Sequence, residues 1–135
     1  MAAGRVGAQA GDKLAHLIGS EYDQVRPSVP TPRPIEVIFH SPVTCLVHHQ
    51  FSDAAYYTTA SGAGVFASGT SSWICGLVDE CTIHPQEQHL VDVVTTITTT
   101  LLQAFAAGPA GKAHPARDNL APLNISATTI RDMTR

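Results

Sequence analysis

Residues 54–77 read AAYYTTASGAGVFASGTSSWICGL, and this stretch contains the strongest structural signals of the chain. A polar and aromatic run at 54–59 and a short apolar run at 65–67 flank a glycine-rich turn, which is typical of two neighbouring strands. Gly69 suits a chain reversal, because glycine adopts positive φ without a Cβ clash. The side-chain oxygens of Thr70, Ser71 and Ser72 can then cap a helical turn that contains the single tryptophan. The stretch therefore predicts an α/β fold.

Upstream of this stretch we expect one helix and one strand. Residues 12–18 begin with an N-cap aspartate, place three apolar residues on one face and precede a glycine, which predicts a short helix. The prolines at 27–34 make the next segment extended. Residues 35–40 alternate β-branched and aromatic side chains, which predicts a strand that the Ser-Pro pair at 41–42 ends. Residues 43–53 are ambiguous, because VTCLVHH could prolong the strand or form another.

The longest element is expected at residues 85–107. Pro85 suits the first helical position, and a Gly-Pro pair follows the last one. Apolar residues recur at helical spacing and form one stripe, which consists of Leu90, Val94, Ile97, Leu101 and Phe105. The run VVTTITTT opposes a helix, because β-branched residues lose side-chain freedom there. We favour the helix, which needs a sheet to pack on because its intrinsic propensity is low.

The composition indicates one small domain that leaves part of its surface to be covered. The chain has 135 residues, of which 44% are hydrophobic and only 14% are charged. An average soluble domain has about 25% charged residues. We therefore expect self-association or contact with another protein chain. We assign residues 1–11 to a disordered segment or linker, 12–110 to the α/β domain and 111–135 to an extended tail that wraps the domain or frays.

The charge pattern argues against a nucleic-acid partner, and the hydropathy pattern argues against a membrane span. The net charge is −3, and the eight Lys and Arg residues are scattered rather than gathered into a basic stripe. No apolar run approaches the roughly 20 residues that a membrane helix requires. The first residues, MAAGRVGAQAGDK, contain no apolar core of a signal peptide. The localisation therefore stays open.

The cysteine and histidine residues leave open whether the chain forms a disulfide or binds a metal ion. The three cysteines (Cys45, Cys75 and Cys81) cannot all pair within one chain, and free thiols or one disulfide are both compatible with the sequence. Cys75, Cys81, His84 and His89 are zinc-ligand types, but their spacing is wider than in structural zinc sites. His40, His48 and His49 lie near Cys45, yet neighbouring residues of a strand point to opposite faces. We predict no cofactor, with iron and zinc as the metals to test.

Four segments together resemble one known family. They are GSEYDQV (19–25), PTPRPIEVIFHSPVTC (30–45), DAAYYTTASGAGVFASGTSSWICGL (53–77) and LLQAFAAGPAGKAHPARDNL (101–120). They resemble the C-terminal region of proteins similar to the large (beta) subunit of N,N-dimethylformamidase. The resemblance covers about residues 12–120 and is most specific in the motifs YYTT, SGAGVF and SGT with the tryptophan and cysteine that follow.

This resemblance implies a class I glutamine amidotransferase-like, flavodoxin-like α/β domain. Because the family's full domain has further strands and helices upstream, it implies a partial sheet with one long C-terminal covering helix. It also implies amide (C–N) hydrolase chemistry, which in the family is associated with an iron held by tyrosine and glutamate side chains. No motif of this chain matches those ligands. The related amidotransferases use a Cys-His-Glu triad, and its G-x-C-x-G elbow does not occur in this sequence.

Glu21, Tyr22 and Asp23 form the best candidate site of the chain. Two carboxylates in one loop can bind a cation or a substrate hydroxyl, or act as a general base. An α/β sheet also holds its ligands in loops at strand ends. The alternatives are a solvated loop, or a loop in which Asp23 caps a turn and Glu21 pairs with Arg26 or Arg33. We name Glu21 and Asp23 as candidate catalytic residues and Tyr22 as a candidate ligand-binding residue.

Three further aromatic residues, Tyr56, Tyr57 and Trp73, are candidate ligand-binding residues. The two tyrosines alternate on a strand, so one is expected in the core and the other at a loop or cavity. Three functions are compatible with the sequence. The first is a structural part, non-catalytic alone, of a dimethylformamidase-beta-like, amidotransferase-like domain. The second is a contribution of Glu21 or Asp23 to an amide hydrolase site that other chains complete, and the third is a small ligand- or carbohydrate-binding module.

Overall fold

The computed structural model describes residues 9, 11–26, 28–78, 87–126 and 128–129. Three strands form an antiparallel sheet in the order β2 (Ile35–Cys45), β3 (His48–Thr58) and β4 (Gly64–Ala67). The two strands expected at 54–59 and 65–67 lie in β3 and β4, so this prediction is confirmed. The fold is mixed α/β, but a parallel, flavodoxin-like sheet is not shown by the described residues.

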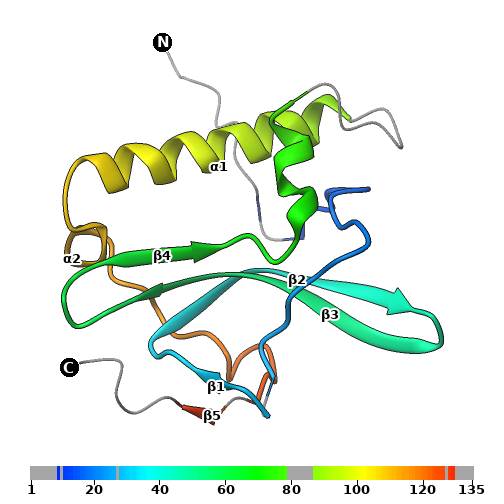
Figure 1. The fold of residues 1–135 in the computed structure, drawn as a ribbon, viewed down its shortest axis with the longest axis horizontal. Coiled ribbons are helices and arrows are strands. Elements are labelled where there is room, and N and C mark those ends of the chain that lie inside the picture. Colours follow the sequence, from blue (N-terminus) through cyan, green and yellow to red (C-terminus); the bar gives the residue numbers. More distant parts are fainter. Residues whose placement is uncertain (1–8, 10, 27, 79–86, 127, 130–135) are drawn as a thin grey trace.

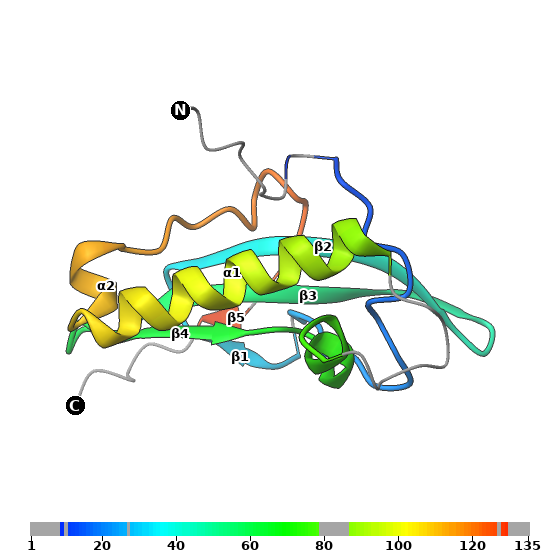
Figure 2. The same ribbon diagram turned by 90° about the horizontal axis from the view of Figure 1, so that it is seen from above.

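The elements lie in three layers (Figure 1). The long helix α1 (Gln88–Ala106) covers one face of the sheet, and β1 (Pro30–Thr31) and β5 (Thr128–Thr129) form a short parallel pair on the other side. The 3-10 helix η1 (Ser71–Gly76) follows β4 and packs against α1. Figure 2 shows α1 crossing above the sheet, with η1 beside its N-terminal half.

Two hydrophobic clusters hold these layers together. The first lies between α1 and the sheet and consists of Leu17, Trp73, Leu90 and Val94, with Phe39 and Phe66 packed against it. The second lies on the opposite face of the sheet and consists of Ile35, Val37, Ala55 and Leu120. Both faces of this small sheet are therefore covered.

The predicted long helix is confirmed, because burial of its stripe outweighs its low intrinsic propensity. Leu90 and Val94 are fully buried, and Ile97 packs against the first cluster. The stripe is covered only in its N-terminal half, since Phe105 is 39% exposed. The expected first helical residue, Pro85, lies outside the described residues.

The Ser-Pro pair at 41–42 does not end the first strand, so that prediction is wrong. β2 continues to Cys45, and Pro42 pairs in register with Phe51 of β3. β2 is an edge strand, where a residue without an N–H group costs no ladder hydrogen bond on its outer side. The ambiguous residues both prolong this strand and begin the next one, with a turn at Leu46, which has a φ of 57°.

The helix expected at residues 12–18 is also wrong. These residues form an irregular segment, and His16 has a φ of 64°, which a right-handed helix excludes. A helix of two turns is unstable alone, because nucleation fixes several residues for one hydrogen bond. The irregular path instead buries Leu17 against Trp73 and α1.

The C-terminal segment packs onto the edge of β2. After the short helix α2 (Ala110–Ala113), Leu120 enters the second hydrophobic cluster. The side chain of Asn119 accepts a hydrogen bond from Val37 N–H (2.7 Å) and donates one to Val37 O (2.8 Å), as a neighbouring strand would. The division into residues 1–11, 12–110 and 111–135 stays a prediction.

Asp118 makes the stability of this contact depend on pH. Its carboxylate accepts hydrogen bonds from the Arg33 guanidinium and from Ile35 N–H. Burial opposes its ionisation, but the hydrogen bonds and charge of Arg33 with the backbone donors outweigh burial, so the pKa of Asp118 lies below its usual value. A carboxylate of this kind stabilises the fold above about pH 4, and the contribution is lost as the pH falls further.

We therefore expect Asp118→Asn to lower the free energy of unfolding at pH 7 by about 1 kcal/mol or less, because the pair is partly exposed. The difference from the wild-type chain should shrink at pH 3. Urea unfolding at both pH values measures it. An equal difference at the two pH values would contradict this role of the ionised carboxylate.

Candidate functional site

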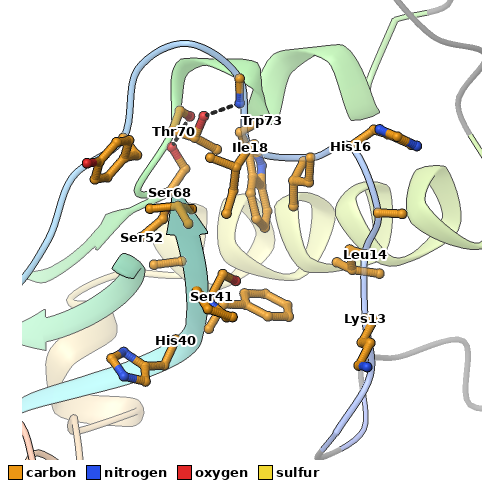
Figure 3. Close-up of a pocket in the computed structure, with 18 of the residues that line it drawn as sticks. Lys13, Leu14, His16, Ile18, His40, Ser41, Ser52, Ser68, Thr70 and Trp73 are labelled. Atoms are coloured by element: carbon orange, nitrogen blue, oxygen red, sulfur yellow. Dashed lines mark hydrogen bonds between the residues drawn. The ribbon is translucent and has the colours of Figure 1, made fainter. Parts of the chain in front are cut away.

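A cavity of about 980 Å³ lies between the N-terminal residues 11–20, the β2–β3 hairpin and η1. Its volume is at the upper end of the range of about 300–1,000 Å³ that is usual for ligand pockets. Figure 3 shows Leu14 and Ile18 on one side, Trp73 beside them, and Ser52, Ser68 and Thr70 close together. The walls are thus partly apolar and partly hydroxyl-lined.

Thr70 organises one end of this cavity. Its hydroxyl donates to Glu21 O (3.0 Å) and accepts from Ser72 N–H (3.2 Å), which confirms the predicted cap of the following helical turn. Its neighbour Gly69 has a φ of 74°, and a Cβ there would lie 2.5 Å from Asp53 O. The glycine is therefore needed both for its backbone conformation and for the close approach to β3.

Glu21 and Asp23 join the same region through different groups. The carboxylate of Glu21 accepts a hydrogen bond from Ser71 N–H (3.0 Å) at the start of η1. Asp23 is held through its backbone, which donates to Gly69 O and accepts from Asp53 N–H, both at 2.9 Å. Both residues are exposed. The Glu21 side chain thus has a structural partner, and the catalytic role of the two carboxylates stays a prediction.

The arginines that could have paired with Glu21 have other partners. Arg26 donates to the side-chain oxygen of Gln50 (2.8 Å), and Arg33 binds Asp118. Tyr22 donates to the same oxygen of Gln50 (2.6 Å) and lines the cavity. Of the predicted triplet, Tyr22 is therefore the member that reaches the cavity with its side chain.

The other predicted aromatic residues are dispersed. Trp73 lines the cavity, but it is only 8% exposed, and its indole N–H donates to Thr98 (3.0 Å). Tyr56 donates to His114 O (2.9 Å), and Tyr57 packs against the second cluster on the other face. Burial raises the pKa of Tyr56 above its usual value, and the negative charge of Glu36 raises it further. Tyr56 therefore stays a neutral donor.

An aspartate–histidine pair was not expected from the sequence. Asp53 is buried, and its carboxylate lies 2.6 Å from Nδ1 of His40 and accepts from Val25 N–H at 2.9 Å. The His40 ring stacks on Phe51 with a centroid separation of 3.9 Å. The His40 tautomer with a proton on Nδ1 can donate a hydrogen bond to this carboxylate oxygen. The strand register that joins these residues has no local sequence signal.

No three His, Cys, Asp or Glu side chains lie close enough to hold a metal ion in the part of the chain that the structure describes. Cys81 and His84 of the suggested zinc series lie outside that part. Cys45 is an exposed thiol and is not joined to Cys75. The described helices include none that is long and apolar enough to cross a membrane.

The β2–β3 hairpin projects beyond η1 as an arm, which we define as residues 38–51 (Figure 1). Residues 37–52 include no Asp, Glu, Lys or Arg. At the tip, Leu46 is 91% and Val47 is 82% exposed. Proteins usually protect such projecting strands with charged residues. An uncharged arm with an apolar tip is typical of a surface that another protein segment covers.

Comparison with known proteins gives one match. The family described as N,N-dimethylformamidase beta subunit-like, C-terminal, matches residues 2–87, which is well over half of the chain. No curated protein and no solved structure matches it.

Proposed function

Because this chain belongs to the N,N-dimethylformamidase beta subunit-like, C-terminal family, we propose that it is a structural part of a larger amidotransferase-like domain and is not catalytic alone. In this proposal the flavodoxin-like parallel sheet belongs to the upstream part of a dimethylformamidase-beta-like protein. The antiparallel strands of this chain then lie beside that sheet. Three strands are fewer than the five or six that an average sheet contains.

The arm is the observation that supports this proposal. Its proposed partner is the upstream part of a dimethylformamidase-beta-like protein. An arm without fixed charges needs a partner surface that is also uncharged, because burying an unpaired charge is costly. Pro42 removes an N–H group from the outer edge of β2, which disfavours the addition of another strand there. Contact through Leu46 and Val47 at the tip is therefore favoured over strand addition.

We expect the double substitution Leu46→Asp and Val47→Asp to weaken binding to a recombinant upstream part of a dimethylformamidase-beta-like protein by roughly ten-fold or more, since it buries charge in the contact. Light scattering after size-exclusion chromatography, with titration calorimetry, measures this. The matched control is Leu102→Asp, a position on α1 that is 63% exposed. This control should bind as the wild-type chain does.

Two outcomes would contradict the proposed partner. The first is a wild-type chain that stays a monomer and does not bind the upstream part. The second is a homodimer that the arm substitutions dissociate, since a second copy would then be the partner.

A hydrolytic role for Asp23 is the second candidate function, and its backbone contacts favour it. Its backbone N–H and C=O groups are both hydrogen-bonded, which fixes the point from which the exposed side chain projects. If Asp23 acts as a general base, Asp23→Asn should reduce amide hydrolysis by the mixture with the upstream part at least ten-fold, roughly the lower end for acid–base catalysis. Glu21→Gln is the matched control, because that carboxylate already caps η1. Equal rates for all three proteins would exclude the role.

A further inference from the structure

Five polar side chains of the cavity lining use their donors within the chain. The hydroxyl of Ser52 donates to Gly69 O (3.0 Å), and that of Ser68 donates to Thr70 O (2.9 Å). Tyr22 donates to Gln50, Thr70 donates to Glu21 O, and Trp73 donates to Thr98. The donors of these five lining side chains are thus committed to partners within the chain. The hydroxyl oxygens of Ser52, Ser68 and Tyr22 still offer lone pairs, whereas that of Thr70 already accepts from Ser72 N–H and Gly19 N–H.

The cavity is also poor in charge. The Asp, Glu, Lys and Arg residues among its lining are Asp12 and Lys13. Asp12 accepts a hydrogen bond from Gln9 N–H (2.7 Å), and Figure 3 shows Lys13 at the opposite end from Thr70. His40 borders the cavity, but its ring is turned to the other face of the sheet, toward Asp53. A charged ligand would therefore lose its hydration near Thr70 without gaining a counter-charge.

We propose that this cavity binds a small neutral molecule that has an apolar body and at least one N–H or O–H donor. Phe39, Ile18 and Trp73 supply the apolar wall, and the oxygens of Ser68 and Tyr22 accept from the ligand. Ser68 and Tyr22 are partly exposed, so a ligand can reach them. The arm also lines this cavity, through Phe39 and Leu46 among others, but the ligand contacts proposed here do not involve Leu46 or Val47. The two proposals are therefore tested by different substitutions.

Ligand binding can be followed by the fluorescence of Trp73, because it is the only tryptophan of the sequence and lines the cavity. We suggest four probes of one shape: cyclohexanol, cyclohexyl methyl ether, cyclohexanecarboxylate and cyclohexylammonium. None of them absorbs where tryptophan is excited. Cyclohexanol should change the Trp73 emission in a saturable manner. The ether, which lacks the donor, should bind roughly five-fold more weakly, the factor that one hydrogen bond contributes. The two ions should bind more weakly than cyclohexanol.

Two variants locate the site. Ser41→Leu places a larger side chain on the cavity wall at a half-buried strand position and should abolish the saturable change. Ser68→Ala removes one acceptor and should reduce the difference between cyclohexanol and its ether. Ser61→Ala, in the exposed turn before β4, is the control that should behave as the wild-type chain.

Each other outcome would overturn the proposal. Absence of a saturable change with cyclohexanol would show that the cavity does not hold such a molecule. Equal affinity for cyclohexanol and the ether would exclude donor recognition. Binding that survives both Ser41→Leu and Ser68→Ala would place the ligand elsewhere. If Ser41→Leu does not fold, Ser68→Ala alone still decides the case.

Discussion

Trp73→Ala is expected to lower the free energy of unfolding by about 3–5 kcal/mol, the largest effect of any substitution considered for this chain. The indole is 8% exposed and packs between Phe39 and Phe66, at centroid distances of 6.3 and 5.4 Å. Truncation leaves a cavity between η1, the sheet and α1. It also leaves the Thr98 hydroxyl without its indole donor.

Urea unfolding followed by far-UV circular dichroism measures this loss, since the variant has no tryptophan fluorescence. Ile74→Ala is the matched control. Ile74 is the next residue of η1 but is 59% exposed, so its truncation should cost no more than about 0.5 kcal/mol. Similar losses for the two variants would mean that η1 does not pack on the sheet as described.

Asp53→Ala should be the second most destabilising change, at about 2–4 kcal/mol. The carboxylate accepts from Val25 N–H and from the His40 ring, and its side chain is 1% exposed. Alanine would leave the Val25 donor without this acceptor and would release His40. Hydrogen bonds to charged groups contribute about 1.5–3 kcal/mol each, and a buried donor without a partner adds to the loss.

Asp23→Ala provides the comparison for this prediction. Asp23 is exposed, and its described hydrogen bonds are made by its backbone, which alanine retains. Its removal should change the free energy of unfolding by no more than about 0.5 kcal/mol. Chemical unfolding of both variants at pH 7 tests the contrast. Equal effects would show that the Asp53–His40 pair contributes nothing to stability.

Local signals were sufficient for the segments around Gly69 and α1. Gly69 predicts a reversal and the hydroxyl residues at 70–72 predict a capped turn, and both features depend on neighbouring residues only. The apolar stripe of α1 likewise identifies a helix, although its β-branched residues oppose one. At Pro42 and at residues 12–18, equally local signals were misleading. Edge position decided the first case and burial of Leu17 decided the second.

The candidate site was likewise only partly predictable from the sequence. Tyr22 and Trp73 were named from the sequence, and both line the cavity. The sequence offered no means to find Ser52 and Ser68, because serine hydroxyls have no pattern of their own. Asp53 and His40 also escaped it, since they are 13 residues apart and meet only through the strand register.

Local sequence features specify the α/β class, the turn at Gly69 with the cap from residues 70–72, the covering helix and the low charge of the arm. These features follow from dihedral preference, side-chain periodicity and composition, which act over a few neighbouring residues. The antiparallel order of the strands, the irregular path of residues 12–18 and the cavity beside them arise from the tertiary structure alone. They depend on which distant surfaces are buried together, and burial is a property of the folded chain as a whole.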